Sequence, residues 1–405
     1  MMAAREYETS HPWLNLSLDL SRAPIDLWLL LGEARSKIDH ISGALLKPEV
    51  AEMLHLVFLA KGVHATTAIE GNTLTEEQAR ELIEGTLRLP ESQEYLAREM
   101  DNIVSAFNAI RDELITGGER DLTPDDIKRY NALVLDGLEL ETEVVPGAMR
   151  THSVVVARYR GAPWQDCDYL LDQLCEWLKG PGFTPPDQTM RLPYAILKAV
   201  AAHLYLAWIH PFGDGNGRTA RLMELQILLA AGVPTPATHL LSNHYNQTRS
   251  EYQRVLDEAS RTPEGPLDFV RYAVRGFVDG LRDQLNLIRE QQFDDRWEQY
   301  IYETFGDTKS AAQIRQRQLM LDISKAKRPV PRTEFTALSP ALAAAYAGKS
   351  GKTRSRDINA LIRAELLRVE RFRDERGRVR IGWVPNRELI RAFLPITAPV
   401  DDSNE

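Results

Sequence analysis

One short segment, residues 210–221, concentrates the side chains that could carry out chemistry. It reads His-Pro-Phe-Gly-Asp-Gly-Asn-Gly-Arg-Thr-Ala-Arg, so three glycines alternate with polar residues. Gly213, Gly215 and Gly217 would let the backbone turn tightly and let its N–H groups approach a ligand. The segment leads into an expected helix, whose free N–H groups and dipole attract anions at its N-terminus. The pattern therefore predicts an anion-binding site.

The side chains of the same segment indicate that the anion is a chain of phosphates. Arg218 and Arg221 are three residues apart, so they share one face of a helix, and two guanidiniums suit a polyphosphate. Asp214 offers a hard oxygen ligand for Mg²⁺, and Asn216 offers a neutral donor and acceptor. His210, with an ordinary pKa of about 6.5, is suited to be a general base. A base beside phosphates implies a hydroxyl that is deprotonated to attack phosphorus.

Two expected helices position this segment. Residues 191–209 are apolar nearly all round, which predicts a buried helix, and residues 217–231 predict a second helix that ends at 232–234. Helical spacing also predicts helices over 50–69, 94–114, 125–136 and 169–178. We expect Thr73 with Glu76 to form a capping box, and Thr123 to cap a helix that begins at Pro124.

The twelve residues 210–221 match in full the H-P-F-x-D-G-N-G-R-x-x-R signature of Fic proteins, so the chain resembles that family. The resemblance implies a mostly helical core that transfers AMP from ATP to a hydroxyl of a target protein. It further implies His210 as the general base, Asp214 as the Mg²⁺ ligand, and Arg218 and Arg221 as phosphate-binding arginines. Asn216, with the glycines Gly213, Gly215 and Gly217, would cradle the phosphates.

A second segment, Thr66-Thr-Ala-Ile-Glu-Gly-Asn72, lies at the end of an expected helix. Taken alone, it predicts a plain helix end with Glu70 in water. It is also similar to the [S/T]-x-x-x-E-[G/N] inhibitory motif of Fic proteins, with Thr66, Glu70 and Gly71 at the fixed positions. The resemblance implies that Glu70 binds Arg221 and keeps ATP out of its productive pose.

Two further segments resemble parts of the family. Gly147-x-x-Arg150 followed by Val154, Val155 and Val156 looks like the β-hairpin flap that pairs with a target strand, although an ordinary surface hairpin is an equal interpretation. Tyr252 and Gln253 stand where the family usually has two tyrosines beside the adenine. Tyr252 could equally be a core aromatic residue, and Gln253 departs from the pattern.

The overall composition is that of an ordinary globular protein. Of 405 residues, 43% are hydrophobic and 26% charged, and the net charge of −9 argues against nucleic-acid binding by the whole chain. No apolar run reaches the roughly 18 residues of a membrane span, so we expect no membrane contact. The two cysteines, Cys167 and Cys175, fit reduced thiols in a cytoplasmic protein.

The C-terminal part differs from the rest in charge. From Asp307 to Arg391 there are 20 Lys and Arg residues against 9 Asp and Glu residues. Helices expected at 310–323, 340–346 and 356–369 precede an alternating strand at 378–384, which is the layout of a winged helix-turn-helix. Such a module could bind DNA or another protein, and we favour protein.

Together these features predict a mainly α fold: a Fic-type helical core with a small β-hairpin flap, plus a C-terminal winged helix-turn-helix-like domain. The expected divisions are an N-terminal helical region with the inhibitory helix (1–115), a catalytic core (116–275), a linker helix (276–305), the winged-helix-like domain (306–395) and a disordered tail (396–405).

The leading functional hypothesis is an adenylyltransferase that modifies a target protein and itself, uses ATP and Mg²⁺, is held inactive by Glu70, and could form a homodimer. A second hypothesis keeps the site but has it remove AMP or transfer another nucleotide. A third, from another class, is a DNA-binding regulator that binds DNA through 306–395 and senses nucleotide with its core. The presence of His210 argues against the third, because a pure sensor needs no base.

Overall fold

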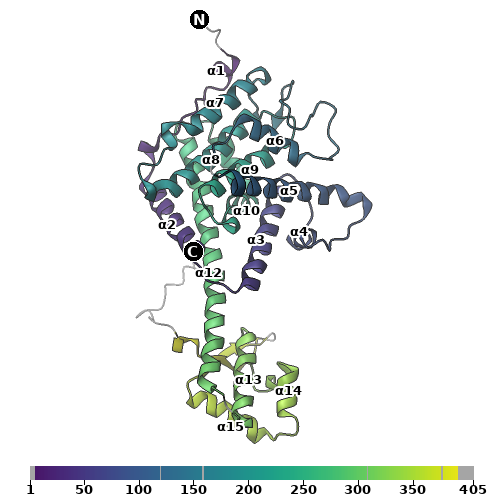
Figure 1. Ribbon diagram of the computed structural model, residues 1–405, viewed down its shortest axis with the longest axis vertical. Coiled ribbons are helices and arrows are strands. Elements are labelled where there is room, and N and C mark those ends of the chain that lie inside the picture. Colours follow the sequence, from purple (N-terminus) through teal and green to yellow (C-terminus); the bar gives the residue numbers. More distant parts are fainter. Residues whose placement is uncertain (1–4, 119, 157–158, 308, 375–376, 391–405) are drawn as a thin grey trace. The chain divides into compact units, whose positions relative to one another are not determined.

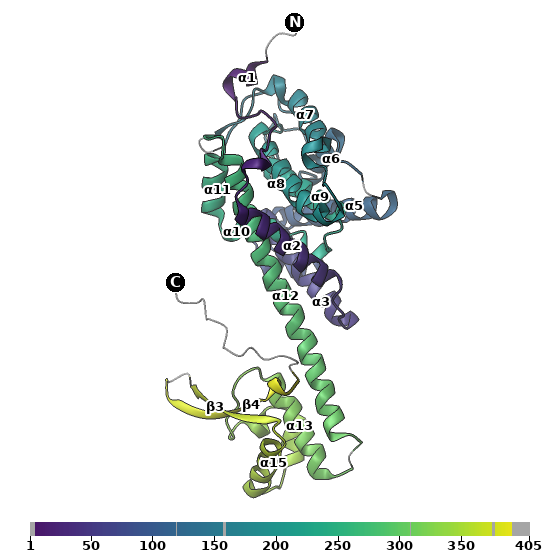
Figure 2. The same ribbon diagram turned by 90° about the vertical axis from the view of Figure 1, so that its left-hand side faces the viewer.

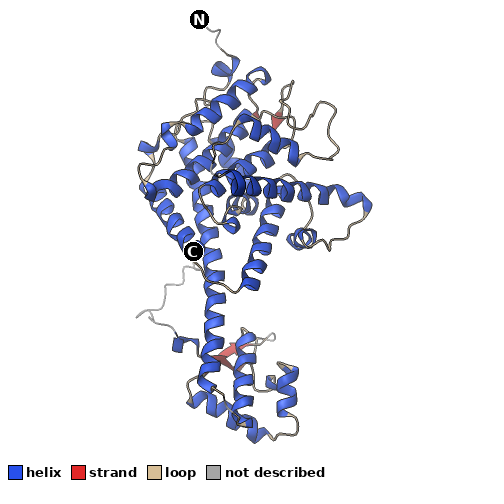
Figure 3. Ribbon diagram, viewed as in Figure 1, coloured by secondary structure: helices blue, strands red, loops and turns tan. Residues whose placement is uncertain are grey.

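A computed structural model describes residues 5–390 apart from 119, 157–158, 308 and 375–376. Helices dominate these residues, and the named strands form two small antiparallel hairpins (Figure 3). The chain divides into two compact units, Met1–Ile288 and Arg289–Glu405. The fold is mainly α, as the sequence predicted.

In the first unit, the described residues form eleven α-helices, the beginning of a twelfth and one short hairpin. They are α1 (Glu6–Ser10), α2 (Ile25–Ser42), α3 (Pro48–Ala68), α4 (Glu76–Ile83), α5 (Glu94–Gly117), α6 (Pro124–Val134), β1 (Val155–Val156), β2 (Tyr159–Arg160), α7 (Cys167–Lys179), α8 (Arg191–Ile209), α9 (Asn216–Ala230), α10 (Leu240–Gln247), α11 (Arg249–Glu258) and the start of α12 (Gly265–Phe305).

The helices α8 and α9 form the centre of this unit, because α8 is apolar on almost every side. They pack along one another, and α2, α6 and α7 pack around them (Figures 1 and 2). We expected no apolar segment long enough to cross a membrane, but residues 188–209 are long and apolar enough. Of the most apolar 18-residue stretch in this segment, 72% is buried inside the fold. The segment is therefore a core helix in this structure.

The N-terminal caps of α4 and α6 can be compared with the caps predicted from the sequence. Thr123 caps α6 as predicted, with Pro124 in the first turn and Asp126 completing a capping box. The prediction of Thr73 with Glu76 was wrong, because the capping box of α4 is formed by Thr75 and Gln78. The side chain of Asn72 accepts a hydrogen bond from the Leu74 backbone at 3.0 Å, so the preceding residues form a turn and the helix begins later.

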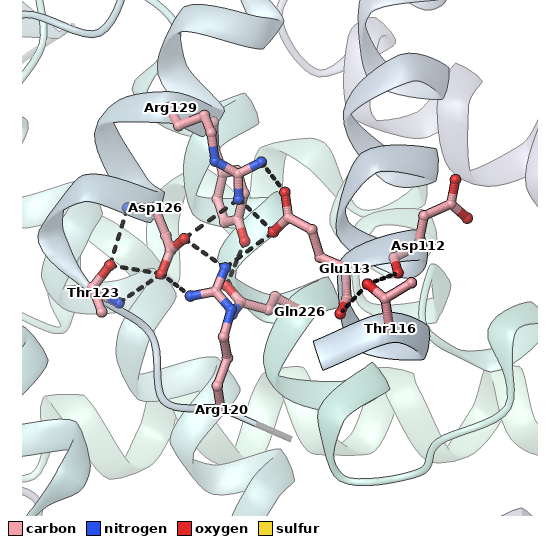
Figure 4. A network of polar contacts seen from close by, with 9 residues as sticks. Asp112, Glu113, Thr116, Arg120, Thr123, Asp126, Arg129 and Gln226 are labelled. Atoms are coloured by element: carbon pink, nitrogen blue, oxygen red, sulfur yellow. Dashed lines mark hydrogen bonds and ion pairs between the residues drawn. The ribbon is translucent and has the colours of Figure 1, made fainter. Parts of the chain in front are cut away.

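Figure 4 shows a charged network between α5 and α6. Asp126, with 8% of its side chain exposed, accepts hydrogen bonds from both terminal nitrogens of Arg120 at 2.6 and 2.7 Å. Arg129 binds both carboxylate oxygens of Glu113 at 2.6 and 2.7 Å. This network fixes the start of α6, which in turn supports the candidate site.

The second unit has its own apolar core, which includes Trp297, Leu319, Phe335 and Leu361. Its elements after α12 are α13 (Ala311–Lys325), α14 (Pro340–Tyr346), α15 (Gly351–Arg363), β3 (Leu367–Arg373) and β4 (Val379–Pro385).

One helix prediction in this unit was partly wrong. We expected a helix over 356–369, but α15 ends at Arg363 and residues from Leu367 onward pair with β4. Glu365 adopts a positive φ of 58°, which ends the helix at a residue that is not glycine. The winged-helix assignment of this unit stays a prediction, and residues 396–405 lie outside the described residues.

Candidate active site

The segment 210–221 forms the turn between α8 and α9, and it is held by its own hydrogen bonds. His210 ends α8 in the left-handed region, with φ 50° and ψ 58°. The Asn216 side chain donates to the Phe212 carbonyl at 2.9 Å and accepts from the Phe212 N–H at 3.0 Å. Asn216, predicted to cradle phosphate, therefore holds the loop in shape.

A residue that sequence reasoning missed, Asn131 on α6, joins this loop to a second segment. Its fully buried side chain donates to the Asp214 carbonyl at 2.8 Å and accepts from the Gly147 N–H at 2.9 Å. Gly215 has a φ of 76°, and a Cβ there would lie 3.0 Å from the Asn131 amide. The loop needs glycine at 215 for both its backbone conformation and this close approach.

Arg221 is held by the end of α3. Its Nε donates to Thr66 Oγ1 at 2.8 Å, and its Nη2 donates to the Thr66 carbonyl at 2.9 Å and to Glu70 Oε1 at 2.6 Å. The Arg221 side chain is 1% exposed and that of Glu70 is 35% exposed. Burial alone would raise the pKa of Glu70, but Arg221, with Arg218 and His210, holds that pKa below its ordinary value.

The Glu70 carboxylate also lies against the N-terminus of α9. A Cβ built on Gly217, in the first turn of that helix, would overlap Glu70 Oε1. An anionic group therefore already lies at the helix end where the sequence predicted an anion.

Arg218 is buried between two carboxylates. Its Nη2 lies 3.2 Å from Asp214 Oδ1, and its Nη1 lies 3.4 Å from Oε1 of Glu99 on α5. Within the described part of the chain, Nε of Arg218 and Nη1 of Arg221 have no hydrogen-bond partner. Buried donors without a partner are costly, so both guanidiniums retain capacity for an anionic ligand.

His210 lies near enough to Glu70 and Asp214 for their charges to affect its pKa, and its ring is neutral at pH 7. Burial is the main cause that lowers its pKa to about 4; the charge of Arg150 adds to the lowering, whereas a hydrogen bond with the Ala207 carbonyl and the charges of Glu70 and Asp214 oppose it. A neutral ring can accept a proton, and the bond to Ala207 restrains the orientation of the ring.

Arg150 lies in the interior, although the sequence placed it on the flap. It is 2% exposed, and its guanidinium donates to the carbonyls of His210 at 2.8 Å, of His152 at 2.6 Å and of Ala162. Its own N–H donates to the Pro211 carbonyl at 3.0 Å. Arg150 therefore joins both sides of the hairpin to the backbone of the general base candidate.

The hairpin itself is shorter than the valine run suggested. Val155 and Val156 pair with Arg160 and Tyr159, and the Val154 carbonyl accepts from the Gly161 N–H at 3.2 Å outside the strand. Val155 is 60% exposed. The β1 strand thus presents an apolar side chain to solvent next to the candidate site.

The two residues proposed to contact adenine, Tyr252 and Gln253, lie on different faces of α11. Tyr252 is 6% exposed, stacks on Tyr245 with ring centroids 4.8 Å apart, and its hydroxyl lies 2.9 Å from Nε2 of the fully buried His203. Gln253 lies on the exposed face of α11. Tyr252 is thus a core aromatic residue, and its role beside a base stays a prediction.

Within the described residues, no group of three or more His, Cys, Asp or Glu side chains could hold a metal ion. Asp214 is the one predicted ligand, and its side chain is 49% exposed. A single accessible carboxylate is typical of Mg²⁺ sites that substrate phosphates complete, so Asp214 fits an ion that a phosphate-bearing ligand would bring.

Residues 121–228 match the family model described as Fic/DOC family. This chain contains a Fic/DOC family domain. The domain includes the 210–221 loop, Asn131, Arg150 and the hairpin, whereas Glu70 and Glu99 precede the matched segment.

Curated relatives carry the same family name. The chain is similar to protein adenylyltransferase fic-1 of Caenorhabditis briggsae, with 31% identity over 217 residues, which cover 53% of this chain and 38% of the relative. It is also similar to protein adenylyltransferase Fic of Nematostella vectensis, with 29% identity over 215 residues, 53% of this chain and 45% of that protein. The matched part thus spans less than half the length of these relatives.

Solved structures support the fold. A Fic family protein from Desulfovibrio desulfuricans G20 aligns with a TM-score of 0.51 at 20% identity, covering 88% of this chain and 95% of that one. Fic-1 from Caenorhabditis elegans aligns with a TM-score of 0.51 at 23% identity, covering 66% and 74%. At these identities both alignments show the fold alone, so the chemistry must be inferred from the residues of the site.

Proposed function

We propose that this Fic/DOC domain transfers AMP from ATP to a Ser, Thr or Tyr hydroxyl of a target protein. The observation that supports this most directly is the pairing of a neutral His210 with an anion site at the N-terminus of α9. That site holds a carboxylate from Glu70 and two buried arginines with unpartnered N–H groups. The family match and the names of the relatives agree with the same activity.

In the proposed reaction, the target hydroxyl loses its proton to His210 as its oxygen attacks the α-phosphorus. The new O–P bond forms while the bond from the α-phosphorus to the bridging oxygen breaks, and pyrophosphate leaves. Arg218, Arg221 and the N–H groups at the start of α9 bind the phosphates and stabilise the charge that develops on them. When present, Mg²⁺ at Asp214 would neutralise phosphate charge.

We further propose that the structure represents a self-inhibited state. Glu70 uses the guanidinium of Arg221 that a terminal phosphate would need, through a short charge-assisted bond of 2.6 Å. Its carboxylate also lies over Gly217, where it would repel a phosphate. ATP would reach its productive pose only after Glu70 moves away.

The target would be recognised as an added strand on the hairpin. The β1 strand has Val155 exposed at its edge, and Arg150 joins the same hairpin to His210. A target segment that pairs with this strand would bring its hydroxyl to a fixed place relative to the imidazole.

The test is incubation of the purified chain with α-labelled ATP, UTP or GTP, followed by detection of label on protein. We expect Glu70→Gly to label itself from ATP at least about tenfold faster than the unmutated chain. The double variant Glu70→Gly/His210→Ala should not label.

Equal labelling of the unmutated chain and Glu70→Gly would contradict self-inhibition. Preferential labelling from UTP or GTP would replace ATP as the substrate. If label transferred to the protein is instead released faster by the unmutated chain than by Glu70→Gly, the site removes AMP with the help of Glu70.

A further inference from the structure

Glu99 is a carboxylate that no motif singles out, and it lies beside a phosphate-binding arginine. It is on α5, outside the 210–221 loop and outside the turn of residues 70–72, which we call the Glu70 turn. Its Oε1 is 3.4 Å from Nη1 of Arg218, whose side chain is 5% exposed. Glu99 itself is 21% exposed, so this ion pair is partly shielded from water.

The second oxygen of Glu99 is held by the Glu70 turn. Asn72 Nδ2 donates to Glu99 Oε2 at 2.8 Å and to the Leu96 carbonyl at 2.9 Å. Asn72 is 7% exposed, and its Oδ1 accepts from the Leu74 N–H. The Asn72 side chain therefore donates two bonds to α5 and accepts one from the turn that follows it.

Gly71 lets the two neighbours reach different partners. Its φ of 108° is a conformation that residues with a side chain rarely adopt. Because the chain reverses there, Glu70 reaches Arg221 directly while Asn72 reaches Arg218 through Glu99. One turn of three residues is thereby connected to both phosphate-binding arginines.

We propose that Glu99 is a second inhibitory carboxylate, which draws Arg218 away from the nucleotide phosphates and is held in that position by Asn72. This inference rests on the proposed function, because it assumes that ATP phosphates bind Arg218. The negative charge of Glu99 competes with phosphate for the same guanidinium and repels phosphate at short range. Glu70 and Glu99 then each restrain one arginine, and the Glu70 turn couples the two restraints.

The experiment measures ATP binding without turnover. The background is Glu70→Gly/His210→Ala, which removes the first carboxylate and the general base. Glu99→Gln is added to it, because glutamine keeps an oxygen that can accept the Asn72 bond but loses the charge. The matched control is Glu94→Gln, which removes an exposed charge from the first turn of the same helix. Titration calorimetry with Mg–ATP gives the dissociation constant of each variant.

We expect Glu99→Gln to tighten ATP binding about fivefold, at the lower end of coupling between sites, while Glu94→Gln leaves the dissociation constant unchanged. Unchanged binding in Glu99→Gln would overturn the proposal. Weaker binding would also overturn it, since Glu99 would then position Arg218 for phosphate. If the background variant binds no ATP at all, the proposed function itself fails, and this outcome is distinct from both others.

Discussion

The carboxylate of Glu70 occupies the space directly above the Cα of Gly217, so no side chain fits there while Glu70 binds Arg221. The same space is the approach to the free N–H groups of α9. Under the proposed function, Glu70 and a phosphate of the substrate would therefore compete for one small volume next to Gly217.

Gly217→Ala tests this shared volume. The added methyl group would displace Glu70 and also stand where phosphate must approach the helix. We expect ATP binding to weaken at least about tenfold in both the unmutated and the Glu70→Gly backgrounds, as measured by titration calorimetry. A useful comparison is Gly182→Ala, where the added Cβ would meet no atom within 4 Å. Tighter ATP binding in Gly217→Ala would show that only Glu70 uses this space.

Arg150→Gln tests the connection between the hairpin and the general base. Losing the bonds to the carbonyls of His210, His152 and Ala162 should let the imidazole and the target strand shift relative to one another. We expect kcat for target labelling in the Glu70→Gly background to fall about a hundredfold, with a smaller change in the ATP dissociation constant.

Arg160→Gln is the matched control for Arg150, because Arg160 belongs to the same hairpin and is exposed. It should retain kcat. Equal losses in both variants would mean that charge on the hairpin matters and that the buried bonds of Arg150 do not.

The pH dependence of the Glu70→Gly variant reports on His210. The pKa of this ring is lowered to about 4, so the ring stays neutral as pH falls through the range where an ordinary histidine is half protonated. Because Glu70 opposes that lowering, its removal keeps the pKa low. We expect kcat/KM for ATP to be flat from pH 8 to about pH 5.5 and to fall below that. A midpoint at about pH 6.5 would mean that the ring is solvated in the free enzyme.

Asp126→Asn tests the network that fixes α6. Hydrogen bonds from Arg120 and Thr123 outweigh the effect of burial and lower the pKa of Asp126 to about 2. A carboxyl group with a depressed pKa in the folded state stabilises the fold above its unfolded pKa and loses this contribution as pH falls through the folded value. We expect Asp126→Asn to lower the free energy of unfolding by about 2 kcal/mol at pH 7, and the difference from the unmutated chain to shrink between about pH 4 and pH 2.

Urea unfolding at several pH values measures this contribution, with Asp125→Asn as its control. Asp125 is exposed and lies in the same first turn of α6, so it shares the helix-dipole effect but not the buried bonds. Similar losses in the two variants would assign the effect to the dipole.

The loop could be predicted from the sequence because its chemistry is local. Glycine spacing, the two arginines and the following helix all lie within twelve residues, and the Glu70 motif adds one further short pattern. The apolar residues of 191–209 likewise predicted a buried helix, and α8 is buried at the centre of the first unit.

The supporting contacts could not be predicted because each joins residues far apart in the chain. Asn131 and Glu99 reach the loop from α6 and α5, and nothing in their own neighbourhoods sets them apart from other polar residues on helices. Arg150 looked like a flap residue because its neighbours are β-branched, yet its burial depends on how α8 ends. The cap of α4 moved to Thr75 because Asn72 bonds to Leu74 and Leu96, and the second of these is a partner from another helix.

The reciprocal bonds between Asn216 and Phe212 mean that the loop is already in shape before any nucleotide arrives. Under the inhibition that we propose, opening the site would then require the side chains of Glu70 and Glu99 to rotate away from Arg221 and Arg218, and the backbone of the loop would not have to rearrange. Occupancy would follow simple mass action, so the concentration of ATP in the cell would itself set the fraction of molecules that are ready to react.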